Sequence, residues 1–214
     1  MRSLAGWFRW HEWRSTLPAD PRPLETLYAD FVAIDLETTG LDARRDAAVA
    51  VALVPFRGGA PIDGYETLVN PGRPIPATST RIHGITDEMV SAAPRLGEVL
   101  DDLEALCGDH VVVGHGVAFD LAILEKVRQA HHRPPLRNTA LCTMRLAAAL
   151  HPGWADVTLE SVASRLGVPV VGRHTARGDA LVAGALILGL LPELARRGHR
   201  TIADALWLQR SVLM

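Results

Sequence analysis

The sequence predicts an α/β fold in which helices flank a central mixed sheet of five strands. Two patterns lead to this prediction. Between residues 31 and 70, three apolar segments follow one another through short connections, which is typical of an antiparallel three-strand meander. After residue 95, segments with apolar residues at helical spacing alternate with short, mostly apolar segments, as they do when helices pack on a sheet. A chain of 214 residues can bury one full core of this kind.

The expected strands are defined by apolar runs and by the turn residues between them. We expect the meander strands over residues 31–37, 47–56 and 62–70, and two further strands over residues 110–114 and 139–142. The segment R-G-G-A at residues 57–60 should form the hairpin turn between the second and third strands. The run V-V-V within residues 110–114 is typical of a strand that is buried on both faces.

Helices are predicted where apolar residues recur every three to four positions. We expect them over residues 95–109, 118–130, 143–150, 158–167 and 176–191. Residues 71–86 are rich in Pro and Gly and should form a loop, which ends at Thr86, a residue suited to begin a helix. A last helix should lie within residues 193–214, with Trp207 on its apolar face.

We expect one globular domain over residues 29–192, preceded by an extension over residues 1–28 and followed by a helical tail over residues 193–214. The extension is rich in tryptophan, and its tryptophans recur at helical spacing as Trp7, Trp10 and Trp13. Such a stripe either packs against its own domain or docks a partner, such as a polymerase, another protein or nucleic acid bases.

The composition is that of a soluble globular protein, with 48% hydrophobic and 21% charged residues. The net charge of −2 argues against a generally basic nucleic-acid-binding surface, although metal ions that neutralise four carboxylates would leave a mildly basic remainder.

The longest apolar run, residues 180–191, is too short to span a membrane, and charges interrupt the N-terminal segment before a signal peptide could form. Two distant cysteines, Cys107 and Cys142, favour a reducing, cytoplasmic location.

The stretch V-A-I-D-L-E-T-T-G-L at residues 32–41 ends a buried strand with two acids, Asp35 and Glu37. Because residues i and i+2 of a strand point to the same face, the two carboxylates should lie side by side. Like charges in that position repel each other, and each is costly to remove from water. Bound cations would relieve the repulsion.

Asp120 and Asp179 each lie near the start of a predicted helix. Taken alone, each is also explained as an acid that interacts favourably with the helix dipole. Together with Asp35 and Glu37, however, the order of the elements would bring four acids to one end of the sheet. Carboxylate oxygens are ligands that Mg²⁺ and Mn²⁺ prefer, and two such ions clamp the attacking and leaving oxygens of a phosphoryl displacement.

His174 lies five residues before Asp179, in the loop that enters the same helix. Histidine has an ordinary pKa of about 6.5, so this imidazole could accept a proton from an attacking water near neutral pH. The alternative is a surface-loop histidine with no part in chemistry. Arg173 and Arg177 flank His174 and could contact phosphate.

Four motifs carry a resemblance to a known family: DLETTGL at 35–41, VNPGRPIPATSTRIHGITDEMV at 69–90, VVVGHGVAFDLAIL at 111–124 and HTARGDA at 174–180. In this order and spacing, the sequence resembles the DnaQ-like 3′→5′ exonucleases of the DEDDh branch, which include proofreading exonucleases of the DNA polymerase III epsilon type. The resemblance implies an RNase H-like fold for residues 29–192. It also implies two Mg²⁺ or Mn²⁺ ions and hydrolysis at the 3′ end of nucleic acid, with release of nucleoside 5′-monophosphates.

The resemblance also assigns roles to individual residues. The catalytic set would consist of the metal-binding acids Asp35, Glu37, Asp120 and Asp179 and the general base His174. The substrate-binding residues would be Thr38, Thr39, Gly40, Leu41, His83, His115 and Phe119. Stacking of the terminal base on Leu41 or a phenylalanine would favour single-stranded DNA. His83 has a second interpretation, in which it only stabilises its loop.

The sequence departs from the family at Gly116 and Cys142, where relatives usually have Asn and Asp, and neither position belongs to the predicted catalytic set. Two alternative functions fit the same residues. One is a 3′→5′ exoribonuclease of the RNase T or oligoribonuclease type, because nothing in the motifs separates ribose from deoxyribose. The other is a non-catalytic, polymerase-associated binding module that has kept the fold.

Overall fold

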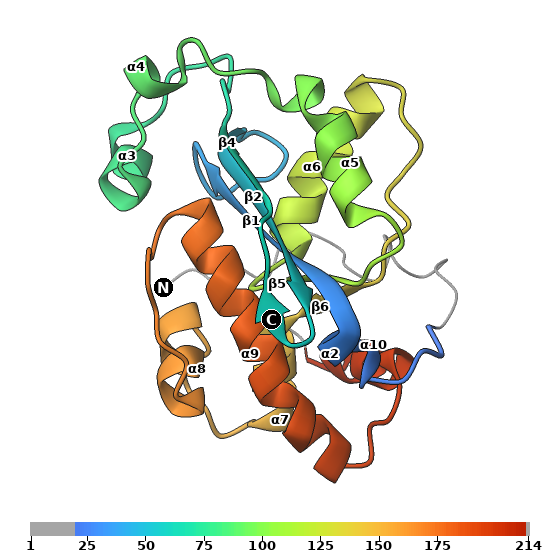
Figure 1. The fold of residues 1–214 in the computed structure, drawn as a ribbon. Helices are drawn as coiled ribbons and strands as arrows, with labels where there is room; N and C mark the ends of the chain where they lie inside the picture. The colour runs from blue at the N-terminus through green and yellow to red at the C-terminus, as the bar shows by residue number, and fades with distance from the viewer. Residues whose placement is uncertain (1–19, 213–214) are drawn as a thin grey trace.

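A mixed β-sheet runs through the centre of the computed structural model, which describes residues 20–212 (Figure 1). Its strands are β1 (Asp30–Thr38), β2 (Ala48–Arg57), β3 (Ala60–Pro61), β4 (Tyr65–Leu68), β5 (Val112–Gly114) and β6 (Ala140–Cys142). They lie in the order β3-β2-β1-β5-β6, and β4 also pairs with β2. The pairs β1–β2, β2–β3 and β2–β4 are antiparallel, whereas β1–β5 and β5–β6 are parallel. The predicted meander and mixed sheet are therefore confirmed.

The third predicted strand is divided into β3 and β4, so the sheet has six strands rather than five. Phe56 pairs with Pro61, but Leu53 pairs with Tyr65, which places an additional residue on the third strand between the two pairs. Gly64 allows this irregular segment to pack closely on β2, because a Cβ on Gly64 would lie 2.1 Å from the carbonyl oxygen of Leu53. A regular strand would not accommodate the additional residue.

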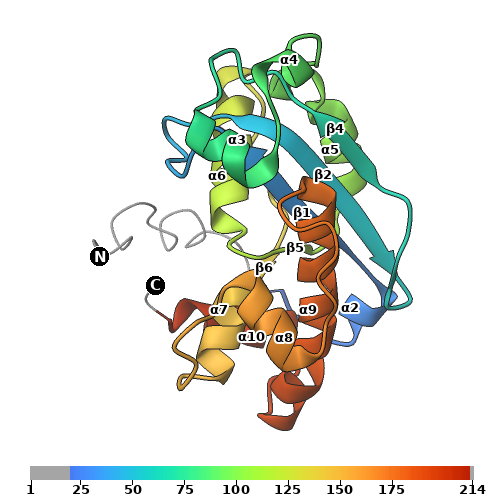
Figure 2. The ribbon, with the colours of Figure 1, turned by 90° about the vertical axis from the view of Figure 1, so that its left-hand side faces the viewer.

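Helices cover both faces of the sheet. They are α2 (Thr26–Ala29), α3 (Ala77–His83), α4 (Asp87–Val90), the 3-10 helix η1 (Leu96–Glu98), α5 (Leu100–Cys107), α6 (Ala118–Ala130), α7 (Thr143–Leu150), α8 (Leu159–Leu166), α9 (Ala176–Arg196) and α10 (Ile202–Arg210). On one face, α7, α8 and α9 share a core with Phe31 and Ala33, whereas on the other α5 and α6 share a core with Val32 and Ile34 (Figure 2). Because alternate residues of β1 enter opposite cores, Asp35 falls on the face that α9 covers.

Helix α9 is long and apolar enough to span a membrane by length and composition, with a mean hydropathy of 1.6 over its most apolar window. In this structure, however, 61% of that window is buried inside the protein. Gly184 brings α9 close to β2, because a Cβ at this position would lie 2.2 Å from the ring of Phe56. The structure therefore uses α9 as a core helix, as the sequence predicts for residues 176–191.

The Pro- and Gly-rich segment after β4 is not the continuous loop that its composition predicts, because it contains α3. Two side-chain hydrogen bonds hold this short helix in place. Ser79 Oγ donates to the carbonyl oxygen of Thr39 at 2.8 Å, and Thr80 Oγ1 donates to the carbonyl oxygen of Ile85 at 3.0 Å. Gly84 then ends α3 in the left-handed conformation. These contacts outweigh the low helix propensity of serine and threonine.

Helix α10 packs against the last strand through Gln209, which is fully buried. Gln209 Nε2 donates to the carbonyl oxygen of Ala140 at 3.0 Å, and Gln209 Oε1 accepts from the N–H of Cys142 at 2.8 Å. Trp207 is 68% exposed, so the prediction that it lies on the packed face of this helix is wrong. A polar residue occupies that face because the edge of β6 needs hydrogen-bond partners.

The segment before β1 is described only in part. Leu24 and Leu27 are buried in the same core as α9. The tryptophan stripe, Trp7, Trp10 and Trp13, lies outside the described residues. The division of the chain into residues 1–28, 29–192 and 193–214 stays a prediction.

Candidate active site

The end of β1 and the start of α9 bring Asp35, Glu37 and Asp179 together. One carboxylate oxygen from each of these residues lies within 4.8 Å of the others. Glu37 and Asp179 are buried, and Asp35 is half-buried. An irregularity helps to place Glu37, because the register of β1 against β2 shifts between Glu37 and Thr38. The structure thus gathers three of the four predicted acids into one cluster.

The local sequence fixes the first turn of α9. Thr175 begins the helix, and its hydroxyl accepts a hydrogen bond from the N–H of Gly178 at 3.1 Å. The preceding loop packs tightly against this turn, because a Cβ on Gly178 would lie 2.0 Å from the carbonyl oxygen of Gly172. Only glycine permits so close an approach. Asp179 is consequently held in the first turn, within reach of the acids of β1.

Asp120, the fourth predicted acid, lies beside the cluster in the first turn of α6. Its Oδ1 accepts a hydrogen bond from the N–H of Leu36 at 3.1 Å, and Leu36 lies between the two acids of β1. Asp120 is buried, and its charge acts on Asp35. It therefore connects α6 to the same end of β1, although it is not one of the three clustered acids.

Burial and mutual repulsion raise the pKa of the acids. Burial raises the pKa of Asp35 well above its ordinary value, and the charges of the three neighbouring acids add to the effect. Burial, with a contribution from Asp179, raises the pKa of Glu37 to about 7. Burial also raises the pKa of Asp120 to about 7. The pKa of Asp179 is raised by burial too, although the nearby Arg173 opposes this shift.

The three clustered acids meet the requirements of a divalent-cation site. Oδ1 of Asp179 is buried and has no hydrogen-bond partner among the described residues, which is unusual for a carboxylate oxygen. Hard oxygen ligands suit Mg²⁺ or Mn²⁺, and a cation would offset the repulsion between the acids. The residues present therefore fit the metal ions that the sequence implies.

His174 lies in the loop that leads into α9, and its backbone φ of +61° is in the left-handed region, which is uncommon for a residue other than glycine. Its Nδ1 lies 3.1 Å from Nη1 of Arg173. Arg173 is in turn ion-paired with both Asp179 and Glu160. The sequence did not indicate that Glu160 contacts this arginine. Strained backbone of this kind clusters at functional sites. His174 is thus linked to the clustered acids through one side chain.

The turn at the end of β1 is built around Asp46, a residue that sequence reasoning missed. Asp46 Oδ1 accepts from the hydroxyl of Thr39 at 3.0 Å, and Asp46 Oδ2 accepts from the N–H of Asp42 at 2.8 Å. Gly40 packs against this carboxylate, which a Cβ at that position would approach to 2.5 Å. Leu41 lies at the tip of the turn and is 83% exposed. The pattern L-D-A-R-R-D was the available signal, since aspartates often stabilise turns in this way.

Besides Thr39, two further predicted substrate-binding residues, Thr38 and His115, have side-chain polar atoms engaged within the protein. The hydroxyl of Thr38 donates to the carbonyl oxygen of Gly40 at 2.7 Å. The Nε2 of His115 lies 3.0 Å from the carbonyl oxygen of Val157, and its Nδ1 lies 2.9 Å from the hydroxyl of Thr143. Burial lowers the pKa of His115 to about 4, so the ring is neutral near pH 7. These bonds favour a structural role for His115 over a substrate contact.

His83 and Phe119 complete the predicted set. Nδ1 of His83 accepts from the N–H of Ile85 at 3.0 Å, which fits the interpretation that His83 stabilises its loop. Nε2 of His83 is buried and accepts or donates no hydrogen bond of ordinary geometry among the described residues, so its part in substrate binding stays a prediction. Phe119 is half-buried and packs against the core that α5 and α6 share.

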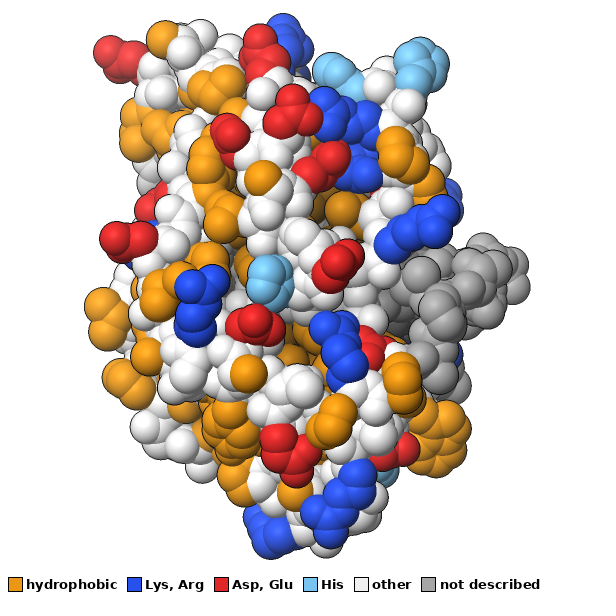
Figure 3. Space-filling view, turned by 45° about the vertical axis from the view of Figure 1, so that its right-hand side comes forward, with side chains coloured by type: hydrophobic (Ala, Val, Ile, Leu, Met, Phe, Trp, Pro, Cys, Tyr) orange, Lys and Arg blue, Asp and Glu red, His pale blue; other side chains and the backbone are white. Residues whose placement is uncertain are grey.

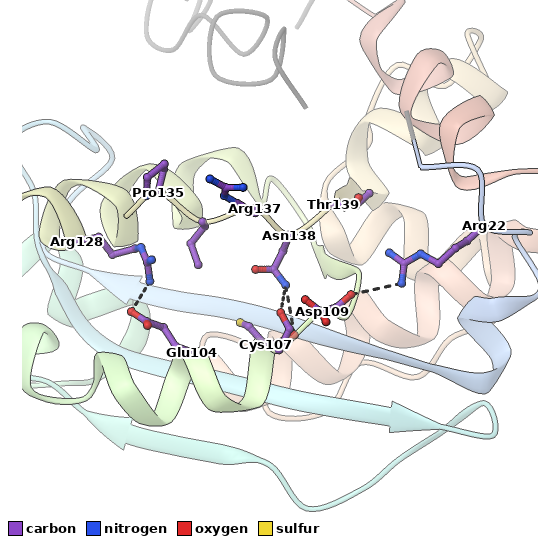
Figure 4. A pocket seen from close by; sticks show the side chains of 11 residues that line it. Arg22, Glu104, Cys107, Asp109, Arg128, Pro135, Arg137, Asn138 and Thr139 are labelled. Carbon is purple, nitrogen blue, oxygen red and sulfur yellow. Dashed lines mark hydrogen bonds and ion pairs between the residues drawn. The ribbon is translucent and has the colours of Figure 1, made fainter. Parts of the chain in front are cut away.

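A separate cavity of about 250 Å³ lies between α5 and the segment that precedes β6 (Figure 4). Several of its polar groups have partners within the protein. Arg128 is ion-paired with Glu104, and the side-chain amide of Asn138 donates to three backbone carbonyl groups. None of the predicted site residues lines this cavity. The cavity is therefore separate from the acidic site.

The raised pKa values predict that the metal-free protein loses stability as the pH rises from about 4 to about 7. Below this range the carboxyls of Glu37 and Asp120 are protonated in the folded and in the unfolded protein. Within it, the unfolded chain releases protons that the folded chain retains, so the folded state binds more protons and its relative stability falls. We expect the melting temperature in EDTA to fall by roughly 5–10 °C between pH 5 and pH 8 from this cause. Thermal unfolding followed by circular dichroism would measure it.

Saturating Mg²⁺ provides the control for this prediction. Because the ions bind the ionised carboxylates, they should remove most of the loss at pH 8. A melting temperature that is independent of pH in EDTA, or that rises toward pH 8, would contradict the prediction.

Comparisons with known proteins place this site in a family. The exonuclease (RNase T) family model matches residues 32–187. DNA polymerase III subunit epsilon of Aquifex aeolicus is 35% identical over 164 residues, which are 77% of this chain and 81% of that protein. The epsilon-like protein of Rhodobacter capsulatus is 38% identical over 86% of this chain, but this covers only 26% of that protein. The PolC-type DNA polymerase III of Bacillus cereus is 32% identical over 82% of this chain and 12% of its own length.

Solved structures agree with the sequence comparison. Exonuclease X in complex with 5′ overhanging duplex DNA matches with a TM-score of 0.65 and 25% identity, covering 84% of this chain and 99% of that one. Escherichia coli exonuclease I in complex with a dT13 oligonucleotide matches with a TM-score of 0.68 and 17% identity, covering 79% of this chain and 42% of that one. The RNase H-like fold that the sequence predicts is thereby confirmed. By its sequence and its fold, the chain belongs to the exonuclease family and is an enzyme of the 3′→5′ exonuclease class.

Proposed function

We propose that this enzyme removes nucleotides from the 3′ end of single-stranded DNA and releases nucleoside 5′-monophosphates, with two Mg²⁺ or Mn²⁺ ions bound. The observation that carries the proposal is the convergence of three carboxylates within 4.8 Å at the end of β1. The chain brings these acids from two distant segments and leaves one buried oxygen of Asp179 without a hydrogen-bond partner among the described residues. A carboxylate with a purely structural role would normally accept a hydrogen bond at each buried oxygen, which Oδ1 of Asp179 does not do.

Asp35, Glu37 and Asp179 would hold the ions, with Asp120 beside them as the fourth acid. When bound, the ions supply the positive charge that stabilises the attacking and leaving oxygens of the displacement. Asp120 also fixes the geometry of the site, because its hydrogen bond to the N–H of Leu36 ties α6 to β1.

His174 would act as the general base that accepts a proton from the attacking water. Imidazole suits this task near neutral pH. The loop of residues 172–175 places His174 at the start of the helix that carries Asp179, and Arg173 links the two side chains. The proton would therefore be accepted beside the clustered acids.

The substrate would be held mainly at its terminal nucleotide. The exposed side chain of Leu41 offers an apolar surface to the terminal base, and such contacts do not distinguish base identity. On the face shown in Figure 3, acidic and basic side chains are interspersed, and the net charge is −2. A broad basic surface that grips many phosphates is not seen on that face. The solved relatives bound to dT13 and to overhanging duplex DNA support DNA as the class of substrate.

We also propose that the enzyme associates with a DNA polymerase. Its relatives include a DNA polymerase III subunit. They also include PolC-type polymerases, in which the matched segment is 12% of a longer chain. The tryptophan-rich residues 1–28 would provide the docking segment. Co-purification with a polymerase of the chain 1–214 and of the chain 20–214, which keeps the buried Leu24 and Leu27, would test this.

An exonuclease assay with matched oligonucleotides tests the proposed function. DNA and RNA of one sequence, single- and double-stranded and labelled at the 3′ end, would be incubated with Mg²⁺, Mn²⁺ or EDTA. We expect labelled mononucleotides from single-stranded DNA with either ion and none in EDTA. A 3′-blocked oligonucleotide is the control for direction. Faster release from RNA would favour the exoribonuclease, and binding of single strands without any release would favour the non-catalytic module.

A further inference from the structure

Arg173 contacts three groups of the candidate site at once. Its Nη1 donates to Oδ2 of Asp179 and lies 3.1 Å from Nδ1 of His174. Its Nε donates to Oε1 of Glu160, on α8, at 2.5 Å. The guanidinium is therefore held between an acid of the cluster, the proposed base and an acid outside the cluster.

The contact with His174 determines which ring nitrogen carries a proton. A guanidinium has N–H donors and no acceptor, so Nδ1 of His174 must be the acceptor in this bond. The neutral ring then carries its proton on Nε2, and the lone pair of Nδ1 is committed to Arg173. In this arrangement neither nitrogen of His174 can accept a proton from water.

The contact with Asp179 places the same guanidinium next to the position of a metal ion, because a cation bound at Oδ1 would share one carboxylate with Arg173 and repel it. Oδ2 of Asp179 is bound by Arg173, whereas Oδ1 is buried and has no partner among the described residues. The guanidinium thus provides counter-charge to an acid whose pKa burial would otherwise raise further. Glu160 offers Arg173 a second anchor at the edge of the cluster.

We propose that Arg173 is a latch that couples metal binding to release of the general base. In the metal-free enzyme, Arg173 balances Asp179 and occupies Nδ1 of His174. Cation binding to Asp179 displaces the guanidinium toward Glu160 and frees the histidine nitrogen. The proposal rests on the proposed role of His174, and Arg173 acts in it as a positioning residue. It would keep the site inactive until the metal is in place.

Titration calorimetry with Mn²⁺ tests the competition without any nucleic acid. Arg173→Ala should bind Mn²⁺ about 10-fold more tightly, because one charge-assisted hydrogen bond no longer has to be broken. Arg173→Lys keeps the charge but not the planar fork, and should still bind at least about threefold more tightly than the wild type. Arg177→Ala, which removes the other arginine beside His174, is the matched control and should change the affinity less than about twofold. If Arg173→Lys matches the wild type, or Arg177→Ala matches Arg173→Ala, net charge alone explains the effect and the latch is refuted.

Nitrogen NMR of the wild-type imidazoles gives a second readout that needs no variant. In the metal-free protein, His174 should show an unprotonated Nδ1 that accepts a hydrogen bond, and Mg²⁺ should change this signal. His115 is an internal reference, because its bonds to Val157 and Thr143 do not involve the acids. A His174 signal that Mg²⁺ leaves unchanged would overturn the proposal. These measurements are separate from the nuclease assay, so a working latch without nucleotide release would refute only the proposed function.

Discussion

Asp35→Asn is expected to lower the rate of nucleotide release by at least about 1,000-fold, because it removes a charge on which metal binding and transition-state stabilisation both depend. Asp35 is the acid whose pKa responds to all three of the others, which places it at the electrostatic centre of the site. Single-turnover release from a 3′-labelled single strand, at saturating Mn²⁺, would measure the loss.

The same substitution should raise the stability of the metal-free protein. The amide keeps the shape of the side chain and removes a buried charge that its neighbours repel. We expect the melting temperature in EDTA at pH 8 to rise by roughly 5 °C. Asp63→Asn, which makes the same chemical change at an exposed position, should alter neither property. Retained nucleotide release, or a less stable metal-free protein, would show that Asp35 is a structural acid.

His174→Ala is expected to lower the turnover rate by a factor of about 100 to 10,000, because the attacking water loses its proton acceptor. The affinity for Mn²⁺ should be largely unchanged, since His174 is not one of the clustered acids. Initial rates and Mn²⁺ titrations of the same preparations would separate the two properties.

Two further variants make the result for His174 decisive. His174→Gly suits the left-handed backbone at this position and should lose as much activity as the alanine variant, so a folding defect would be recognised. His199→Ala removes a histidine from the loop before α10 and should leave the rate unchanged. Full activity of His174→Gly at neutral pH would remove His174 from the mechanism.

The sequence predicts the clustering of Asp35, Glu37 and Asp179 because the placement of these acids follows local rules. Alternation along a strand puts Asp35 and Glu37 on one face, and a threonine N-cap puts Asp179 in the first turn of its helix. Their convergence then follows from the order of the elements, which strand and helix periodicity indicate. The composition of the strands also predicts a sheet covered on both faces, as HVVVG already suggests.

What the sequence did not reveal depends on contacts between distant side chains. Helix α3 is held by the bond from Ser79 to Thr39, and a segment rich in Pro, Gly and Thr gives no local sign of it. Helix α10 turns Gln209 toward β6, where its amide bonds the backbone, and Trp207 is therefore exposed. Hydrophobicity alone would have placed Trp207 on the packed face. The pairing of Arg173 with Glu160 joins the loop before α9 to helix α8, and only the fold determines the relative position of these two segments.

The two hydrogen bonds of Gln209 have a consequence for the behaviour of the protein in solution. The last strand of an open sheet presents a row of backbone groups to which another molecule can add a strand, and this is a common route to aggregation. Here a single amide group occupies two of those backbone positions and imitates a neighbouring strand. Helix α10 thereby covers two backbone groups of β6, and this edge of the sheet offers fewer groups to a strand of another molecule.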